Sequence, residues 1–217
     1  MTLREHALTV RRTARYYTLG DAGPGVRDVW VACHGYGQLA ARFARHFIGL
    51  EQPQRLIVVP EALSRFYVDA AAREQVGASW MTREHRQPEI EDYVAYLDAV
   101  CAAAVGPARS DTRVTAFGFS QGASTMSRWA AMGHFPVARL ILWGGELPPD
   151  LNLAAAAARF AALEAVIVRG LDDQLVTAKT VAGITGRFRE HGVRHRVVEF
   201  EGGHEIDEQV LGSLADG

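Results

Sequence analysis

Short apolar segments alternate with amphipathic segments along most of the chain, and this alternation restricts the fold more than any other feature. Several of the apolar segments contain no polar residue, as expected of strands that are buried on both faces of a parallel sheet. The predicted strands are Tyr16–Leu19, Val29–Cys33, Leu56–Pro60, Val114–Phe119, Leu140–Trp143, Val166–Arg169 and Arg196–Phe200.

The intervening segments repeat their apolar residues with the period of an α-helix. Strands that alternate with helices pair in parallel through right-handed crossovers, so we predict an α/β fold with a doubly wound, mostly parallel sheet and helices on both faces. Tyr16–Leu19 and Leu8–Arg12 are expected to form an antiparallel edge hairpin. The longest gap, about 61–88, is expected to hold a short helix over Tyr67–Gln75 and no large lid. Helices are predicted over 90–104, 121–132, 153–163, 181–188 and 205–214.

Length and composition exclude several classes of protein. The chain has 217 residues, 48% of them hydrophobic, and no linker-like stretch, so we predict one domain over residues 1–217. A net charge of −2 argues against nucleic-acid binding. No stretch approaches the ~18 apolar residues of a membrane span, and no apolar leader follows Met1, so we expect a cytoplasmic protein with no stable membrane insertion. Cys33 and Cys101 are expected to be buried, reduced thiols.

The predicted strand that begins at Val114 runs directly into Gly118-Phe119-Ser120-Gln121-Gly122, and a helical pattern follows. This is the G-x-S-x-G pattern in the strand–turn–helix context of an α/β-hydrolase nucleophile. The glycines permit a tight turn that projects the serine hydroxyl from the edge of the sheet. The alternative is a simple turn in which Ser120 is a helix N-cap. The context favours Ser120 as a nucleophile.

An acid and a base follow Ser120 in the order that this fold requires. Asp172 and Asp173 come just after the strand that ends at Arg169, and His204 follows the last strand. The carboxyl ends of parallel strands meet at one edge of a sheet, so these side chains are expected to approach Ser120. His204 would accept the serine proton, and one of the two aspartates would orient its ring. His191 and His195 are weaker candidates for the base.

Two backbone N–H groups are expected to stabilise the oxyanion of an acyl-transfer reaction. One belongs to the residue after the nucleophile, Gln121, and the other to the loop His34-Gly35-Tyr36-Gly37-Gln38, where Tyr36 is the predicted donor. His34 precedes the nucleophile in the chain. We therefore interpret it as a structural histidine that hydrogen-bonds this loop.

The four motifs together resemble the phospholipase/carboxylesterase family of small α/β-hydrolases, which includes acyl-protein thioesterases and bacterial carboxylesterases. The resemblance extends from about Val29 to His204, and Gly-Phe-Ser-Gln-Gly is its most specific element. It implies Asp173 as the triad acid, because Gly170 and Val176 match the ends of the family's G-x-x-D-x-x-V pattern. The family commonly has proline after this aspartate, where Gln174 stands here.

The resemblance also implies an aromatic residue near the acyl site at Trp80, for which a position in the core is the alternative. Leu175 and the loop from Trp143 to Leu147 are further candidates for lining a substrate pocket. Members of the family are monomers or homodimers, and the same is expected here.

The predicted activity is hydrolysis of a small carboxylic ester through a Ser-His-Asp triad, with thioesters and lysophospholipids as alternative substrates. A peptidase or amidase on the same triad is a second hypothesis, and a non-catalytic ligand-binding α/β-hydrolase a third. The sequence has no metal-ligand spacing, no phosphate-binding loop and no dinucleotide fingerprint. No metal and no cofactor are therefore predicted.

Overall fold

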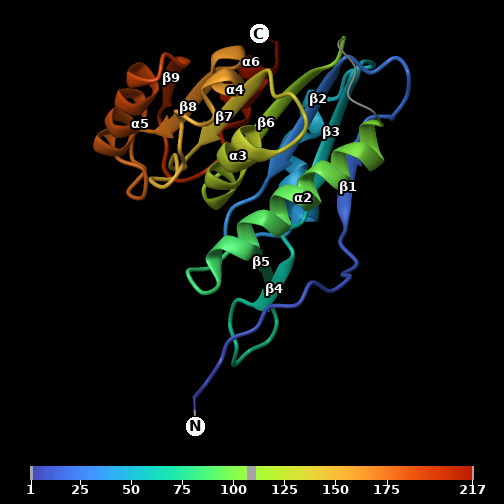
Figure 1. Cartoon of the computed structure of the whole chain (residues 1–217). Helices are drawn as coiled ribbons and strands as arrows, with labels where there is room; N and C mark the ends of the chain where they lie inside the picture. Colours follow the sequence, from blue (N-terminus) through green and yellow to red (C-terminus); the bar gives the residue numbers. More distant parts are fainter. Residues whose placement is uncertain (1, 107–110, 217) are drawn as a thin grey trace.

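A computed structural model describes residues 2–106 and 111–216 of the chain. Its centre is a seven-stranded sheet in the order β1-β3-β2-β6-β7-β8-β9, in which only β1 is antiparallel to its neighbour. The predicted doubly wound, mostly parallel sheet is confirmed (Figure 1). The strands are β1 Tyr16–Leu19, β2 Asp28–Cys33, β3 Arg55–Pro60, β6 Arg113–Phe119, β7 Arg139–Trp143, β8 Glu164–Gly170 and β9 Arg194–Phe200.

Helices cover both faces of this sheet, as predicted. One face packs against α2, α3, α4 and α5, and the other against α1, the 3-10 helix η1 and α6. The helices are α1 Ala40–Phe43, η1 Ala44–Leu50, α2 Arg86–Val105, α3 Gln121–Met132, α4 Ala157–Ala162, α5 Ala178–Glu190 and α6 Glu208–Asp216.

Successive residues of the central strands point to opposite faces, so each strand contributes to two cores. In β2, Val29 and Val31 belong to the core under α2 and α3, whereas Trp30 and Ala32 belong to the core under α1, η1 and α6. This double burial explains why these strands are uninterrupted apolar runs in the sequence. Cys33 and Cys101 are buried and unbonded, as expected.

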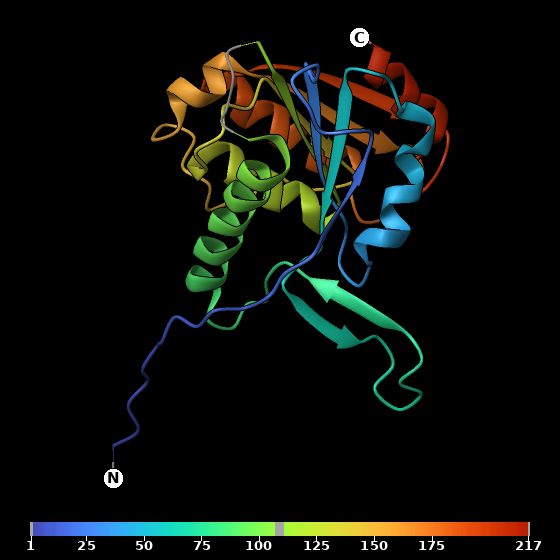
Figure 2. The same cartoon turned by 90° about the vertical axis from the view of Figure 1, so that its right-hand side faces the viewer.

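The predicted helix over Tyr67–Gln75 is wrong. This region forms a two-stranded antiparallel hairpin of β4 Ser64–Tyr67 and β5 Val76–Ser79, which projects from the sheet in Figures 1 and 2. The Asp69 carboxylate accepts hydrogen bonds from the N–H groups of Ala71 and Ala72, at 2.8 and 3.0 Å, as at a helix N-terminus, but only one turn follows. Arg73 then adopts a left-handed conformation with φ 54°.

Two further expectations about the secondary structure need correction. Leu8–Arg12 lies in no strand, because β1 pairs with β3 and not with the preceding segment. The helix expected over 153–163 is shortened to α4. Asn152 caps a first turn by accepting the Ala155 N–H at 2.9 Å, but Ala156 then leaves the helical conformation, with φ −98° and ψ 13°. No helix in the described part of the chain is long and apolar enough to cross a membrane.

Candidate active site

Ser120 is the single residue between the end of β6 and the start of α3. Its backbone has φ 54° and ψ −118°, a conformation that costs of order 1–3 kcal/mol for a residue with a side chain. Close packing enforces this turn: a Cβ at Gly118 would clash with the Gly122 backbone, and a Cβ at Gly122 with the Cys33 carbonyl. The result is a sharp elbow at the carboxyl edge of the sheet, as the glycine pattern predicts.

Asp173 and His204 form a hydrogen-bonded pair at the same edge. Asp173 follows β8 and His204 follows β9, and the His204 Nδ1 lies 2.8 Å from the Asp173 Oδ2. The other carboxylate oxygen accepts the N–H groups of Leu175 at 2.7 Å and Val176 at 2.9 Å. With Nδ1 as the donor to Asp173, Nε2 of His204 is left as a proton acceptor.

The Asp173 carboxylate is held in its ionised form. Burial by itself raises its pKa, since only 4% of the residue is exposed, but the hydrogen bonds from Val176, His204 and Leu175 outweigh burial and lower the pKa below the ordinary value. The neighbouring Asp172 is exposed, and its N–H donates to the Gly202 carbonyl. The geometry therefore pairs the histidine with Asp173, the aspartate that the family pattern indicates.

Contacts around the end of β7 bring the elbow and the Asp173–His204 pair into one site. The Ser120 N–H donates to the Trp143 carbonyl at 2.8 Å, and the Phe119 and His204 rings lie 5.0 Å apart. A Cβ at Gly144 would lie 3.3 Å from His204 Nδ1 and 3.5 Å from the Asp173 carboxylate. Ser120 Oγ and His204 form no hydrogen bond among the described residues, and such bonds are often longer before substrate binds.

The two predicted oxyanion donors also lie at this edge. The Gln121 N–H is the first of α3, where the helix offers no acceptor for it. The Tyr36 N–H lies in the loop after β2, between Gly35 and Gly37. This loop is close to the elbow, because a Cβ at Gly35 would lie 3.2 Å from the Ser120 Cβ. Neither N–H bonds another residue within 2–106 and 111–216, so both are free for a ligand.

Three other histidines bond the backbone instead. His34 is completely buried, its Nδ1 lies 2.8 Å from the Gly35 carbonyl and its Nε2 accepts the Ala62 N–H at 3.1 Å, which confirms it as a structural histidine of the loop. Burial lowers the pKa of His34, consistent with a neutral ring. His191 bonds the Arg187 carbonyl at the end of α5, and His195 bonds the Val193 carbonyl at 2.8 Å.

The two residues proposed to contact substrate differ in exposure. Trp80 is only 3% exposed, and its indole N–H donates to the His34 carbonyl at 2.9 Å, so it supports the loop after β2 from within the core. Leu175 is 66% exposed beside Asp173. Sequence reasoning did not find the contact between Phe119 and His204, nor the hydrogen bonds of the Gln121 side chain described below.

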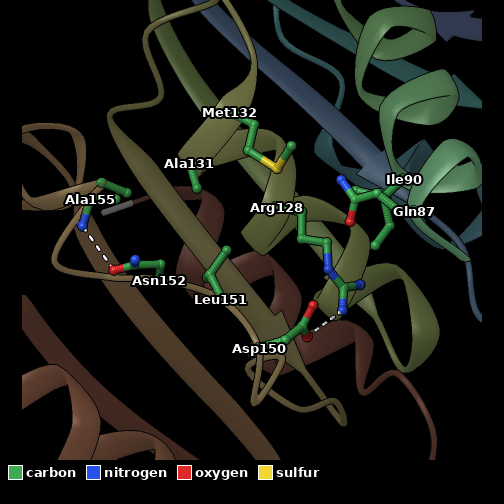
Figure 3. Close-up of a pocket in the computed structure, with 10 residues that line it drawn as sticks. Gln87, Ile90, Arg128, Ala131, Met132, Asp150, Leu151, Asn152 and Ala155 are labelled. Atoms are coloured by element: carbon green, nitrogen blue, oxygen red, sulfur yellow. Dashed lines mark hydrogen bonds and ion pairs between the residues drawn. The ribbon is translucent and has the colours of Figure 1, made fainter.

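Two hollows lie beside the helices α2, α3 and α5. One, of about 250 Å³, is bounded by α2, α3 and residues 150–156 (Figure 3). The charged side chains at one end of this hollow are already paired, because Arg128 bonds Asp150 at 3.0 Å and Tyr93 at 3.3 Å. Burial raises the pKa of Asp150, but Arg86 and Arg128 outweigh it and lower the pKa to about 2. None of the residues that line this hollow belongs to the Ser120, Asp173 and His204 site.

The second hollow, of about 420 Å³, is more open and begins one residue beyond Gly145. Glu146, Leu147 and Pro149 form one wall, and α5 forms the other. It therefore adjoins the loop that packs against Ser120, although none of its lining residues belongs to the Ser120, Asp173 and His204 site either. In the described part of the chain, no group of three or more His, Cys, Asp or Glu side chains is arranged to hold a metal ion.

Comparisons with known proteins agree with this architecture. The sequence model of a family described as Phospholipase/Carboxylesterase matches residues 24–216, whereas no curated protein sequence matches significantly. The fold is similar to the crystal structure of Zea mays acyl-protein thioesterase 2, with 18% identity, a TM-score of 0.69, and coverage of 94% of this chain and 97% of that chain.

Two further solved structures are equally similar in fold. Esterase PE8 has 20% identity and a TM-score of 0.69, with 94% of this chain and 97% of that chain covered. A carboxylesterase from Mesorhizobium loti has 17% identity and a TM-score of 0.69, with 94% and 95% covered. At these identities the likeness establishes the α/β-hydrolase fold, as the alternation of strands and helices and the serine motif predict.

Proposed function

The chain belongs to the phospholipase/carboxylesterase family, and we propose that it is a serine hydrolase that cleaves carboxylic esters through a Ser120–His204–Asp173 triad. The observation that carries the proposal is the 2.8 Å hydrogen bond between His204 and Asp173 at the edge of the sheet where Ser120 occupies its strained turn. Thioesters and lysophospholipids are alternative substrates for the same chemistry.

The first half of the proposed reaction forms an acyl-enzyme. Ser120 Oγ attacks the ester carbonyl carbon while its proton passes to Nε2 of His204, and Asp173 stabilises the imidazolium through Nδ1. The negative charge that develops on the carbonyl oxygen is received by the N–H groups of Tyr36 and Gln121. The tetrahedral intermediate then breaks the bond to the leaving group, which departs as an alcohol or thiol with the proton from His204.

The second half regenerates the enzyme. A water molecule gives a proton to His204 and attacks the acyl-enzyme carbonyl, and the same two N–H groups receive the oxyanion. Collapse releases a carboxylic acid and returns the proton to Ser120. Every proton and charge is carried by these residues, so the mechanism calls for no cofactor.

The open hollow beyond Gly145 supports the proposal of a small-molecule substrate, since the apolar side chains of Leu147, Pro149 and Ile184 line it together with charged ones. We propose that Leu175, exposed next to Asp173, contacts the same substrate from outside this hollow. We propose that this side of the site receives part of the ester, and that its depth limits the length of the chain accepted, with a discrimination of about 1–3 kcal/mol per methylene.

The proposal is tested by hydrolysis of p-nitrophenyl esters over a series of acyl lengths. Ser120→Ala is compared with wild type and with Ser213→Ala, a control on α6 whose hydroxyl bonds only its own helix. We expect Ser120→Ala to lose about three or more decades in kcat and Ser213→Ala to retain wild-type activity. Equal activity of Ser120→Ala and wild type would show that Ser120 is not the nucleophile, and the matching p-nitroanilides separate an esterase from an amidase.

A further inference from the structure

The segment 78–81, at the end of β5, connects the two backbone groups proposed to bind the oxyanion. Ala78 accepts the Gly37 N–H at 2.9 Å and donates its own N–H to the Gln38 carbonyl at 3.1 Å. Two residues further on, the Trp80 indole bonds the His34 carbonyl at 2.9 Å. The loop is therefore held on both sides of Tyr36, by residues of one segment.

The contact between this hairpin and the loop is backbone against backbone. A Cβ at Gly77 would lie 2.5 Å from the Gly37 carbonyl oxygen and 2.7 Å from the Gly37 Cα, so only glycine fits there. Packing of this kind transmits a displacement directly, because no flexible side chain separates the two backbones. A shift of β5 would move the Tyr36 N–H with it.

The side chain of Gln121 ties the same segment to the elbow. Its Oε1 accepts the Trp80 N–H at 3.1 Å, and its Nε2 donates to the Met81 carbonyl at 2.9 Å and to the Ser79 hydroxyl at 3.2 Å. Both ends of the amide are thus bonded to three consecutive residues of the segment. The backbone N–H of the same glutamine is the other proposed oxyanion donor.

We propose that the Gln121 side-chain amide is a positioning group for the oxyanion hole. It holds segment 79–81 against α3, and this segment sets the position of the Tyr36 N–H relative to the Gln121 N–H. The inference rests on the proposed function, since it assigns these N–H groups to an oxyanion. A displacement of about 1 Å at such a site can cost about 100-fold in rate.

The first test compares Gln121→Met with Ser127→Ala, a control on the same helix that also removes one buried hydrogen bond, to the Ala123 carbonyl. Methionine keeps the backbone N–H and a similar length but cannot bond segment 79–81. We expect kcat to fall about 10- to 100-fold, less than the loss of a whole oxyanion donor, while KM changes by less than about threefold. A kcat within about twofold of the control would overturn the proposal.

Gln121→Glu adds a readout that general destabilisation would not produce. The ionised carboxylate can still accept the Trp80 N–H but repels the Met81 carbonyl, whereas the protonated carboxyl can donate to that carbonyl as the amide does. The ratio of variant to wild-type kcat should therefore rise as the pH falls through the titration of this carboxyl. A ratio that stays constant, or falls, contradicts the positioning role.

A measurement independent of catalysis separates this proposal from the proposed function. Hydrogen–deuterium exchange of the peptide that covers residues 34–38 should be faster in Gln121→Met than in Ser127→Ala and wild type. If wild type hydrolyses no ester, the proposed function fails, and the exchange still decides whether Gln121 holds the loop. Unchanged exchange in Gln121→Met would overturn the positioning role even in an active enzyme.

Discussion

The two halves of the site are built by different means. The half with Ser120, Tyr36 and Gln121 is set by close backbone packing, at the glycines of the elbow and where β5 meets the oxyanion loop. The half with His204 also has close backbone packing, of Gly170 against residues 202 and 203, but the ring itself is held by side chains: it donates a hydrogen bond to Asp173 and lies against the ring of Phe119. The Trp143 indole donates to the Glu205 carbonyl next to it. The N–H groups proposed to stabilise charge are thus held mainly by backbone packing, supplemented by the Gln121 amide, while the histidine proposed to carry the proton is oriented by side chains.

This difference has a chemical reason. Oxyanion donors act best when no reorganisation is needed as charge develops, so a rigid backbone suits them. A base must instead receive a proton from one oxygen and deliver it to another, so a histidine that can make small adjustments suits both steps. Substitution of the packed glycines in the first half should therefore act mainly through folding, whereas substitution of the side chains that orient His204 should act mainly through rate.

The largest expected effect concerns the side-chain half. Asp173→Asn keeps the size of the side chain but favours the wrong tautomer of His204, so kcat should fall by about four decades while the protein stays folded. The measurement is ester hydrolysis alongside a thermal unfolding curve. Asp172→Asn is the matched control, because Asp172 is exposed and should be replaced with little loss. A large loss in Asp172→Asn and none in Asp173→Asn would reverse the assignment.

A substitution in the backbone half should mainly reduce stability. In Gly122→Ala the new Cβ meets the Cys33 carbonyl, which a β-strand holds in place, so we expect the free energy of unfolding to fall by about 3 kcal/mol or more. In Gly203→Ala, beside His204, no atom lies within 4 Å of the new Cβ, so the free energy of unfolding should change by less than about 0.5 kcal/mol. Denaturant titration measures both. Equal stability of the two variants would remove the distinction between the halves.

The smallest expected effect is on the pH dependence of stability. The pKa of Asp173 is lower in the folded protein than in the unfolded chain, so its contribution is present above about pH 4 and is lost as the pH falls toward the folded pKa. The melting temperature of wild type should therefore decrease more steeply between about pH 5 and pH 3 than that of Asp173→Asn. Parallel curves would mean that the carboxylate gains nothing from its hydrogen bonds.

The sequence predicts the parts of this molecule that depend on local pattern. The central strands are recognisable because burial on both faces requires uninterrupted apolar runs, as in Val29–Cys33. Ser120 is recognisable because a strained elbow needs glycine at fixed offsets in a strand–turn–helix context. His34 is predicted as structural from its place before the nucleophile, and its two hydrogen bonds bear this out.

The missed features all depend on contacts between distant segments. Ser64–Tyr67 and Val76–Ser79 are short and lack a clear alternation, and they become strands because they pair with each other and because β5 packs on the loop after β2. Nothing near Gln121 in the sequence indicates that its amide bonds residues 79–81. The choice of Asp173 over Asp172 likewise needed the family pattern, since both follow the same strand.

Covalent labelling with a fluorophosphonate shows whether Ser120 is an activated nucleophile. Trypsin should release residues 114–128 as one peptide that contains Ser120, Ser124 and Ser127, and fragmentation identifies which serine carries the label. We expect one phosphonyl group per chain, on Ser120, and none in Ser120→Ala. An unlabelled wild-type protein, or a label on another residue, would contradict the assignment of this elbow as the catalytic centre.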